Sequence, residues 1–183
     1  MDKELNKEIA EYFLTDSREF LKRYEILKEN QTHIGNRNKL LIDIVFSLEC
    51  SLKALIFLES TCNEKETYKK ILKHDLRKLI SMVDINPISD IVMTIDENFE
   101  HFAISSRYTL EANIYFRGST GVLGQSYYST IANPVWLENL YTKAVSLLEY
   151  VASKIDWFVI QEFHKIDIDK LLERSKRLSE LKK

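Results

Sequence analysis

The chain has 183 residues, and its 26 basic and 28 acidic side chains leave a formal net charge of −2. This length suits one compact domain with a sizeable core, and the near-neutral charge excludes a histone-like coat for nucleic acid. Only 4 glycines and 2 prolines are present, which argues against a β-sandwich or barrel. We therefore expect an all-α fold, in which any contact with nucleic acid comes from a local patch.

The first residues and the cysteines indicate the cellular compartment in which we expect the protein. Residues 1–8 alternate in charge, and no apolar run follows that would act as a signal peptide. The most apolar stretch, 40–58, is interrupted by polar and charged residues, which favours a buried core helix over a membrane span. Cys50 and Cys62 lie in or just after this same helix. We therefore expect reduced thiols in a cytoplasmic protein.

Apolar spacing predicts an antiparallel bundle of five or six helices. The second of these helices is apolar around most of its circumference, so we expect it at the centre of the bundle. The first is either continuous or broken near 15–17, where Asp16 and Glu19 stand at the spacing of a capping box. We expect a single bundle domain over 1–165 and a basic C-terminal tail helix over 166–183. The predicted helices are 3–29, 39–60, 67–82, 86–102, 134–163 and 169–183.

Residues 105–131 depart from the helical pattern. They hold three of the four glycines, and apolar and polar residues alternate over 107–116. Alternation of this kind is typical of a strand, so we predict a short extended or hairpin excursion from the bundle. The alternative is a continuation of the fourth helix, which the spacing of Phe99, Phe102, Ser106, Leu110 and Asn113 also fits.

The long helix 134–163 carries two apolar stripes. One follows the period of an antiparallel bundle seam. The other, which includes Trp136, Leu140, Leu147, Val159 and Phe163, is free to meet a second copy, so we expect a homodimer. The alternative is that this second stripe is covered within the same chain, by the first helix or by residues 127–128.

A basic cluster at 65–78 is the strongest local charge signal, with six basic and two acidic residues. Cations that recur on the outer side of a helix suit contacts with phosphates, although the pattern alone favours a solvated helix face. The glycine-containing loop 117–124 offers one more cation, although a plain flexible turn is the favoured interpretation of that loop. The candidate phosphate-binding residues are Lys69, Lys70, Lys73, Arg77 and Arg117.

The pair His74-Asp75 resembles the central element of metal-dependent phosphohydrolases. A metal site there also needs an earlier histidine, for which His33 is the sole candidate, and a later aspartate, Asp96 or Asp156. Only the order along the chain fits, so we favour a bundle or capping histidine and expect no metal and no cofactor. Neither cysteine lies in a setting that lowers its pKa, so no nucleophile is assigned.

Three segments together resemble the HEPN superfamily, the "higher eukaryotes and prokaryotes nucleotide-binding" domains. In that family a buried helix with a glutamate and a Lys-Ala-Leu-like end precedes a His-Asp-Leu segment, an Arg-Tyr element and a long final helix. The resemblance covers roughly residues 39–163. The segments here are Ser47-Leu48-Glu49-Cys50-Ser51-Leu52-Lys53-Ala54-Leu55, Lys73-His74-Asp75-Leu76-Arg77-Lys78-Leu79-Ile80 and Ser106-Arg107-Tyr108.

The resemblance implies an antiparallel helical bundle, commonly dimeric, from prokaryotic toxin–antitoxin, antiphage or CRISPR-linked systems. Many such proteins are metal-independent RNases with an arginine followed, a few residues on, by a histidine in a late helix. This chain has no arginine between 134 and 163, and His101 and Arg107 stand in the reverse order. We therefore expect a non-catalytic or atypical protein that binds RNA, nucleotide or a cognate partner protein.

Two alternatives remain open at this point. One is a divergent metal-independent RNase, whose candidate residues are His101, Arg107 and His164 brought together by the fold. The other is a purely structural interaction module, which joins another protein through its long helix and leucine-bearing tail.

Overall fold

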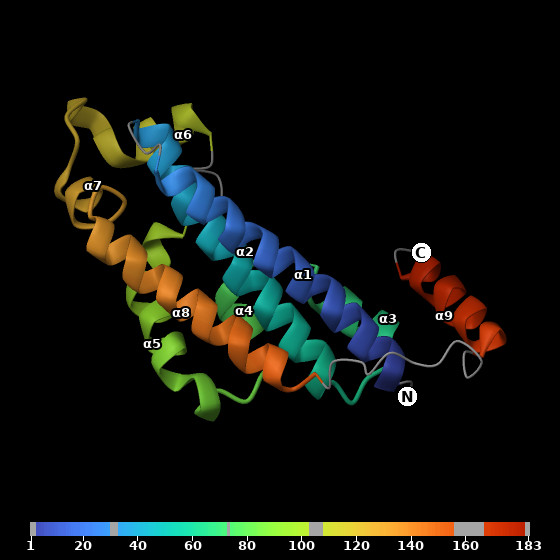
Figure 1. The fold of residues 1–183 in the computed structure, drawn as a ribbon. Helices are drawn as coiled ribbons and strands as arrows, with labels where there is room; N and C mark the ends of the chain where they lie inside the picture. The colour runs from blue at the N-terminus through green and yellow to red at the C-terminus, as the bar shows by residue number, and fades with distance from the viewer. Residues whose placement is uncertain (1–2, 30–32, 73, 103–107, 156–166, 182–183) are drawn as a thin grey trace.

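The computed structural model describes residues 3–29, 33–72, 74–102, 108–155 and 167–181 (Figure 1). Within these ranges all regular structure is helical, with nine α-helices, short 3₁₀ turns and no strand. The predicted all-α class and helical bundle are confirmed, whereas the expected number of five or six helices is wrong. None of the helices in these ranges has the length and hydropathy of a membrane span.

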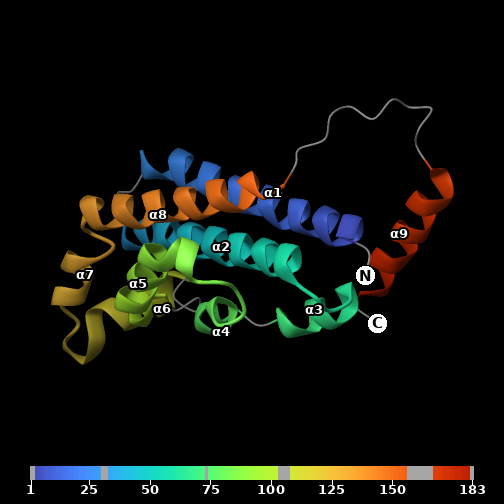
Figure 2. The ribbon, with the colours of Figure 1, turned by 90° about the horizontal axis from the view of Figure 1, so that it is seen from below.

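Three long helices form the body of the bundle. They are α1 (Lys3–Lys28), α2 (Ile34–Glu59) and α8 (Pro134–Ser153). In Figure 2, α1 and α8 lie on one side of α2, and a layer of shorter helices lies on the other side. Nearly every residue of α2 from Leu40 to Phe57 is buried, which confirms its predicted central place.

The shorter helices cover the remaining face and the ends of α2. On the covering face lie α3 (Glu64–Lys70), α4 (Leu76–Ile80) and α5 (Ser89–Asn98), with α6 (Thr109–Arg117) and α7 (Gln125–Ser129) toward one end (Figures 1 and 2). At the other end, α9 (Ile168–Glu180) lies near α3. The 3₁₀ turns are Asn86–Ile88, Phe99–His101 and Gly118–Thr120.

The predicted helix 67–82 is wrong, because two helices stand in its place. The helix α3 ends at Lys70, and Asp75 starts α4 from an extended backbone, its side chain accepting a hydrogen bond from the Lys78 backbone N–H at 3.1 Å. Aspartate in this position satisfies one of the free N–H groups of a helix start. The apolar period continues across the break, so periodicity alone did not reveal it.

The predicted hairpin is also wrong within 108–131, where α6 and α7 form instead. Ala112 and Phe116, four residues apart, are the buried residues of α6, whereas Leu110 and Ile114 are exposed. The apolar alternation thus contains a helical i, i+4 pair, and this pair is the one that packs. Gly118 and Gly121 have φ of 57° and 68°, a left-handed geometry that ends the helix at small steric cost. Residues 105–107 lie outside the described ranges.

The two helix starts marked by Asn-Pro agree with the structure better than the predicted helix 67–82 and the predicted hairpin do. Asn133 accepts hydrogen bonds from the backbone N–H groups of Val135 (3.0 Å) and Trp136 (3.3 Å) and starts α8 as predicted. Asn86 and Pro87 start a 3₁₀ turn, after which α5 follows. The part of the predicted helix 134–163 beyond residue 155 lies in 156–166, outside the described ranges, as does the domain boundary placed at 165.

The second stripe of α8 lies inside the chain. Leu140 and Leu147 are completely buried, and the Trp136 indole N–H donates to the side chain of Asn98 on α5 at 2.8 Å. Val159 and Phe163 lie outside the described ranges. Within the described ranges this stripe therefore packs inside the chain, and the dimer itself stays a prediction.

Hydroxyl groups join α1 to α2 at the middle of the bundle. The buried Ser17 Oγ lies 2.7 Å from Ser47 Oγ and 2.9 Å from Ser51 Oγ. Ser17 lies within an unbroken α1, so the alternative of a break at 15–17 is wrong. Three small side chains in one layer let the two helices approach closely while their polar atoms remain paired.

A buried carboxyl group lies between the same two helices. Asp43 on α2 is 1% exposed, and Arg23 Nη2 on α1 lies 3.0 Å from its Oδ1. Neither carboxyl oxygen has a hydrogen bond of good geometry in the described part of the chain. Burial raises the pKa of Asp43 to about 6, against the opposing effect of the Arg23 guanidinium.

This raised pKa predicts a pH-dependent loss of stability. The stabilisation from protonated Asp43 is complete below its unfolded pKa, near 3.8, and is lost as the pH rises through about 6. The loss is on the order of 3 kcal/mol. In Asp43→Asn this carboxyl no longer titrates, so the stability of the variant relative to the native chain should rise between pH 4 and 7. Urea unfolding at several pH values measures it, and a pH-independent difference would contradict it.

Candidate functional site

A buried glutamate is the centre of the candidate site. Glu49, 3% exposed on α2, accepts a hydrogen bond from Lys53 Nζ at 2.5 Å. His74 Nδ1 lies 2.8 Å and 3.0 Å from the two oxygens of the same carboxylate. Because an ionised carboxylate can only accept, Nδ1 is the donor in this pair. The fold thus brings together three residues of the segments that carry the family resemblance.

Helix geometry and loop conformation account for this contact. Glu49 and Lys53 are four residues apart and share one face of α2, and Lys53 Nζ lies 5.8 Å from the centre of the Phe13 ring on α1. His74 directly precedes Asp75, the extended residue that starts α4, and its ring centre lies 6.3 Å from that of Phe46. The carboxylate therefore holds His74, just before the start of α4, against α2.

The His74 ring remains open to solvent. Its side chain is 61% exposed although Nδ1 is bound to a buried acid. A carboxylate that holds Nδ1–H fixes the tautomer and leaves Nε2 as a hydrogen-bond acceptor. This arrangement places one oriented imidazole on the surface formed by α3 and α4.

A groove of about 410 Å³ lies on this surface, between the end of α2 and helices α3 and α4. Lys70 of α3 and Lys78 of α4 both line it, together with the hydroxyl-bearing residues Ser60, Thr61 and Thr67. Lys70 Nζ lies 3.1 Å from Cys62 Sγ. Glu59 is the acidic residue of the lining, and Lys154 Nζ neutralises it from 3.4 Å.

The candidate phosphate ligands do not form one site. Lys69 is exposed on α3 beside Lys70, and Lys73 lies outside the described ranges. Arg77 stacks on the Phe99 ring at 3.9 Å and lies 3.6 Å from Asp96. Lys78, in the same basic cluster, is the groove residue that was missing from the candidate set, and the break between α3 and α4 explains why its position was not predicted.

Arg117 has a structural role at the opposite end of the bundle. Its guanidinium donates to the Asn113 side chain at 2.9 Å and to the Gly121 carbonyl at 3.0 Å. These bonds close the glycine turn that follows α6. Figure 1 shows α6 far from α3, so Arg117 does not share a surface with the lysines of the groove.

The RNase candidates are not assembled in the described part of the chain. His101 Nδ1 lies 3.2 Å from the Tyr115 hydroxyl, and its ring meets Trp136 edge-on at 5.9 Å. Arg107 and His164 lie outside the described ranges. His101 therefore has an aromatic and hydroxyl environment, and no cation of the candidate set is placed beside it by the described residues.

The candidate metal ligand His33 is far from His74. A helix rises about 1.5 Å per residue, so His33, just before α2, is about 24 Å along the helix axis from Glu49 and its neighbour His74. No group of three His, Cys, Asp or Glu residues gathers in the described ranges, and Asp156 lies outside them.

Burial, and to a lesser degree Glu49, raise the pKa of Cys50 to about 12, so it remains a thiol at neutral pH.

No family model, curated protein or solved structure matches the chain. The HEPN resemblance therefore rests on the quoted sequence segments, and the contact between Glu49 and His74 gives two of these segments a shared physical role.

The buried ion pair gives a prediction for stability. Glu49→Leu leaves the Lys53 ammonium buried without its partner, so unfolding free energy should fall by about 3 to 5 kcal/mol. In the double variant Glu49→Leu/Lys53→Met both charges are replaced by apolar groups, and we expect recovery of much of this loss. Urea unfolding measures both. A double variant less stable than Glu49→Leu would contradict the prediction.

Proposed function

We propose that this protein binds the phosphate backbone of RNA through α3 and α4, as a non-catalytic HEPN-like protein of a prokaryotic toxin–antitoxin or antiphage system. The defence setting comes from the family resemblance alone. The binding surface is supported by the arrangement of lysines around one groove.

The position of Lys70 and Lys78 is the observation that carries this proposal. They belong to different helices, yet both line one groove, and Lys69 extends the same cationic surface along α3. Ammonium groups on two sides of a groove suit a chain of phosphates that runs between them. The exposed, Glu49-oriented imidazole of His74 adds a hydrogen-bond acceptor, Nε2, at the break between the two helices.

Fluorescence anisotropy with labelled single-stranded RNA at several salt concentrations tests this proposal. Each phosphate contact contributes to the salt dependence, so Lys70→Ala and Lys78→Ala should each weaken binding and reduce the slope of log K against log salt by about 1. Lys39→Ala, an exposed lysine on α2, is the matched control and should leave binding unchanged. Equal effects of all three substitutions would show that binding reflects general charge only.

The same samples test the divergent RNase. After incubation with RNA in EDTA, the proposal of a non-catalytic protein predicts intact RNA on a denaturing gel. Metal-independent cleavage that His101→Ala or His164→Ala abolishes would replace it with the RNase hypothesis.

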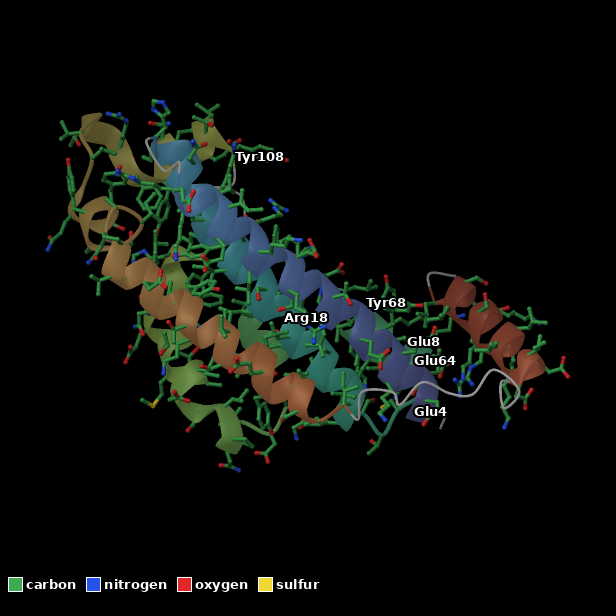
Figure 3. All side chains as sticks on the ribbon, viewed as in Figure 1. Glu4, Glu8, Arg18, Glu64, Tyr68 and Tyr108 are labelled. Carbon is green, nitrogen blue, oxygen red and sulfur yellow. The ribbon has the colours of Figure 1, made fainter. Side chains whose placement is uncertain are left out.

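We further propose that the chain forms a homodimer through α9. One face of this helix presents Ile168, Leu171 and Leu172 to solvent. The opposite part is anchored to α3, because Arg177 donates two hydrogen bonds to Glu64, at 2.8 Å and 2.7 Å. Glu64 lies on the side of the bundle toward α9 (Figure 3). Three exposed aliphatic residues on one short helix are a surface that self-association would bury.

Sedimentation equilibrium at tens of micromolar measures this association. The native chain should have twice the mass of one 21.6 kDa chain, and the variant Leu171→Glu/Leu172→Glu should be monomeric because it places charges in an apolar interface. The matched control is Lys170→Glu/Lys176→Glu, on the same helix. A monomeric native chain would end the proposal, and a dimer that survives the leucine substitutions would exclude α9 as the interface.

A further inference from the structure

Three ionisable side chains form a series of contacts that runs from the core to the surface. Lys53 Nζ lies 2.5 Å from Glu49 Oε1, and the same carboxylate holds His74 Nδ1 at 2.8 Å. The side chains of Lys53, Glu49 and His74 are 10%, 4% and 61% exposed. A nucleophile, a partner that activates it and a third group that orients the partner are the general signature of nucleophilic chemistry. The exposed imidazole has the place of the nucleophile.

Holding the chain against α2 does not require an imidazole. A glutamine at position 74 would also donate an N–H to the Glu49 carboxylate. What the histidine adds is Nε2, which keeps its lone pair because the proton is on Nδ1. Within the described ranges Nε2 of His74 has no hydrogen bond or ion pair, and more than half of the side chain is exposed. The ring therefore presents a nucleophilic nitrogen to solvent.

The Glu49 carboxylate favours bond formation at Nε2 over Nδ1. When Nε2 bonds to an electrophile, the ring acquires a positive charge, and the Nδ1–H hydrogen bond to the carboxylate becomes charge-assisted. Glu49 is buried, so water screens this attraction less than it screens an exposed pair. The same hydrogen bond occupies Nδ1. Glu49 is therefore a positioning residue for chemistry at Nε2 of His74.

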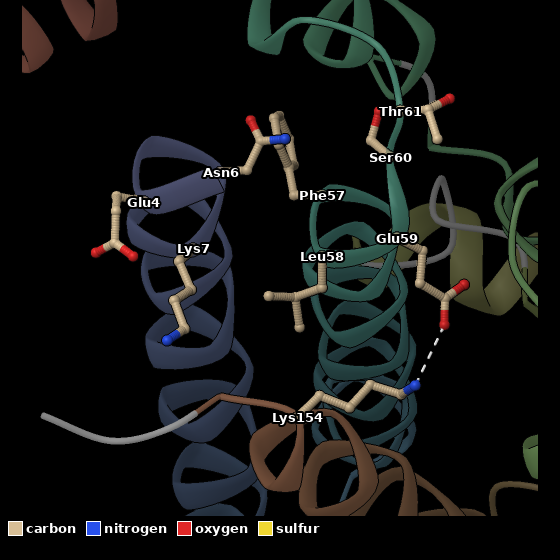
Figure 4. A pocket seen from close by; sticks show the side chains of 9 residues that line it. All are labelled: Glu4, Asn6, Lys7, Phe57, Leu58, Glu59, Ser60, Thr61 and Lys154. Atoms are coloured by element: carbon tan, nitrogen blue, oxygen red, sulfur yellow. Dashed lines mark ion pairs between the residues drawn. The ribbon is translucent and has the colours of Figure 1, made fainter. Parts of the chain in front are cut away.

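The charges around His74 select the electrophile. Lys70 at the end of α3 and Lys78 in α4 stand on either side of His74 in the chain and line the same groove. The nearby acids are engaged, because Asp75 accepts a hydrogen bond at the start of α4 and Glu59 is paired with the lysine that ends α8 (Figure 4). Cationic surroundings stabilise a dianionic phosphoryl group, whereas a neutral acyl group gains nothing from them.

We infer that His74 is a phosphoryl-acceptor residue, which takes a phosphoryl group on Nε2 from a phosphoramidate, a donor whose phosphorus is bound to nitrogen. Nε2 supplies the electron pair of the new N–P bond. The P–N bond of the donor breaks, and its electron pair leaves with the neutral amine. The ring retains the Nδ1 proton, which the Glu49 carboxylate holds.

Potassium phosphoramidate is the probe, with ammonia as the leaving amine, and His33 is the internal control. His33 is an exposed histidine just before α2, and its side chain makes no capping hydrogen bond. Peptide mass spectrometry follows each histidine of the native chain in mildly alkaline solution, and phosphorus NMR identifies the ring nitrogen. We expect phosphorylation of His74 at Nε2 at least about tenfold faster than that of His33. Equal rates at the two histidines, or a product on Nδ1 of His74, would overturn the inference.

Two variants test the role of Glu49. His74→Gln keeps a donor for the carboxylate and should lose only the phosphoryl group at position 74. Glu49→Gln/Lys53→Met replaces both buried charges by neutral groups, so His74 should react no faster than His33. Circular dichroism melting checks that each variant is folded, and His33 should react at its native rate in both. A folded double variant that phosphorylates His74 at the native rate would contradict the inference.

The consequence for RNA rests on the proposed function and is tested separately. A phosphoryl group on His74 places negative charge on the same surface as the groove lysines, so the phosphorylated chain should bind single-stranded RNA at least about tenfold more weakly. A native chain that accepts the phosphoryl group but binds no RNA would overturn the proposed function alone. A native chain that binds RNA but accepts no phosphoryl group would overturn this inference alone.

Discussion

The carboxylate of Glu49 is the contact on which the covering layer of the bundle depends. A charge at this depth is tolerated only when its partners satisfy it, and here they come from two places, Lys53 one turn along the same helix and His74 from the next segment of the chain. The first contact is local, whereas the second determines where the chain passes between α3 and α4. The position of the lysine groove follows from that path, because Lys70 precedes the segment and Lys78 follows it.

The sequence predicted those elements whose signals are local and unambiguous. The central place of α2 follows from its apolar girth, and Asn133 with Pro134 marks the start of α8. Two errors have one cause, which is that apolar spacing does not show where the backbone stops being helical. Asp75 breaks a continuous apolar period, and the alternation over 107–116 contains the Ala112–Phe116 helical pair. Where the spacing of apolar residues fits more than one backbone conformation, contact with α2 decides which conformation forms.

The candidate site was less predictable than the fold. The basic cluster was apparent from charge, but the structural roles of Arg77 and Arg117 depend on Phe99 and Gly121, which are distant in sequence or lie in a turn of unexpected shape. The contact between Glu49 and His74 has no signal in the apolar spacing, because the two residues lie 25 positions apart in different elements. It is a property of the assembled bundle.

The serine layer of Ser17, Ser47 and Ser51 has a further consequence for how α1 lies along α2. Two apolar helices can slide past each other by a turn at modest cost, since leucine against leucine is nearly the same at each position. Sliding here would strand three hydroxyls against aliphatic side chains. The layer therefore acts as a longitudinal stop, much as a single polar position sets the alignment of a coiled coil. With the two helices locked in this alignment, the first turns of α1 stay opposite the last turn of α2, and the end of α2 that borders the groove keeps its place.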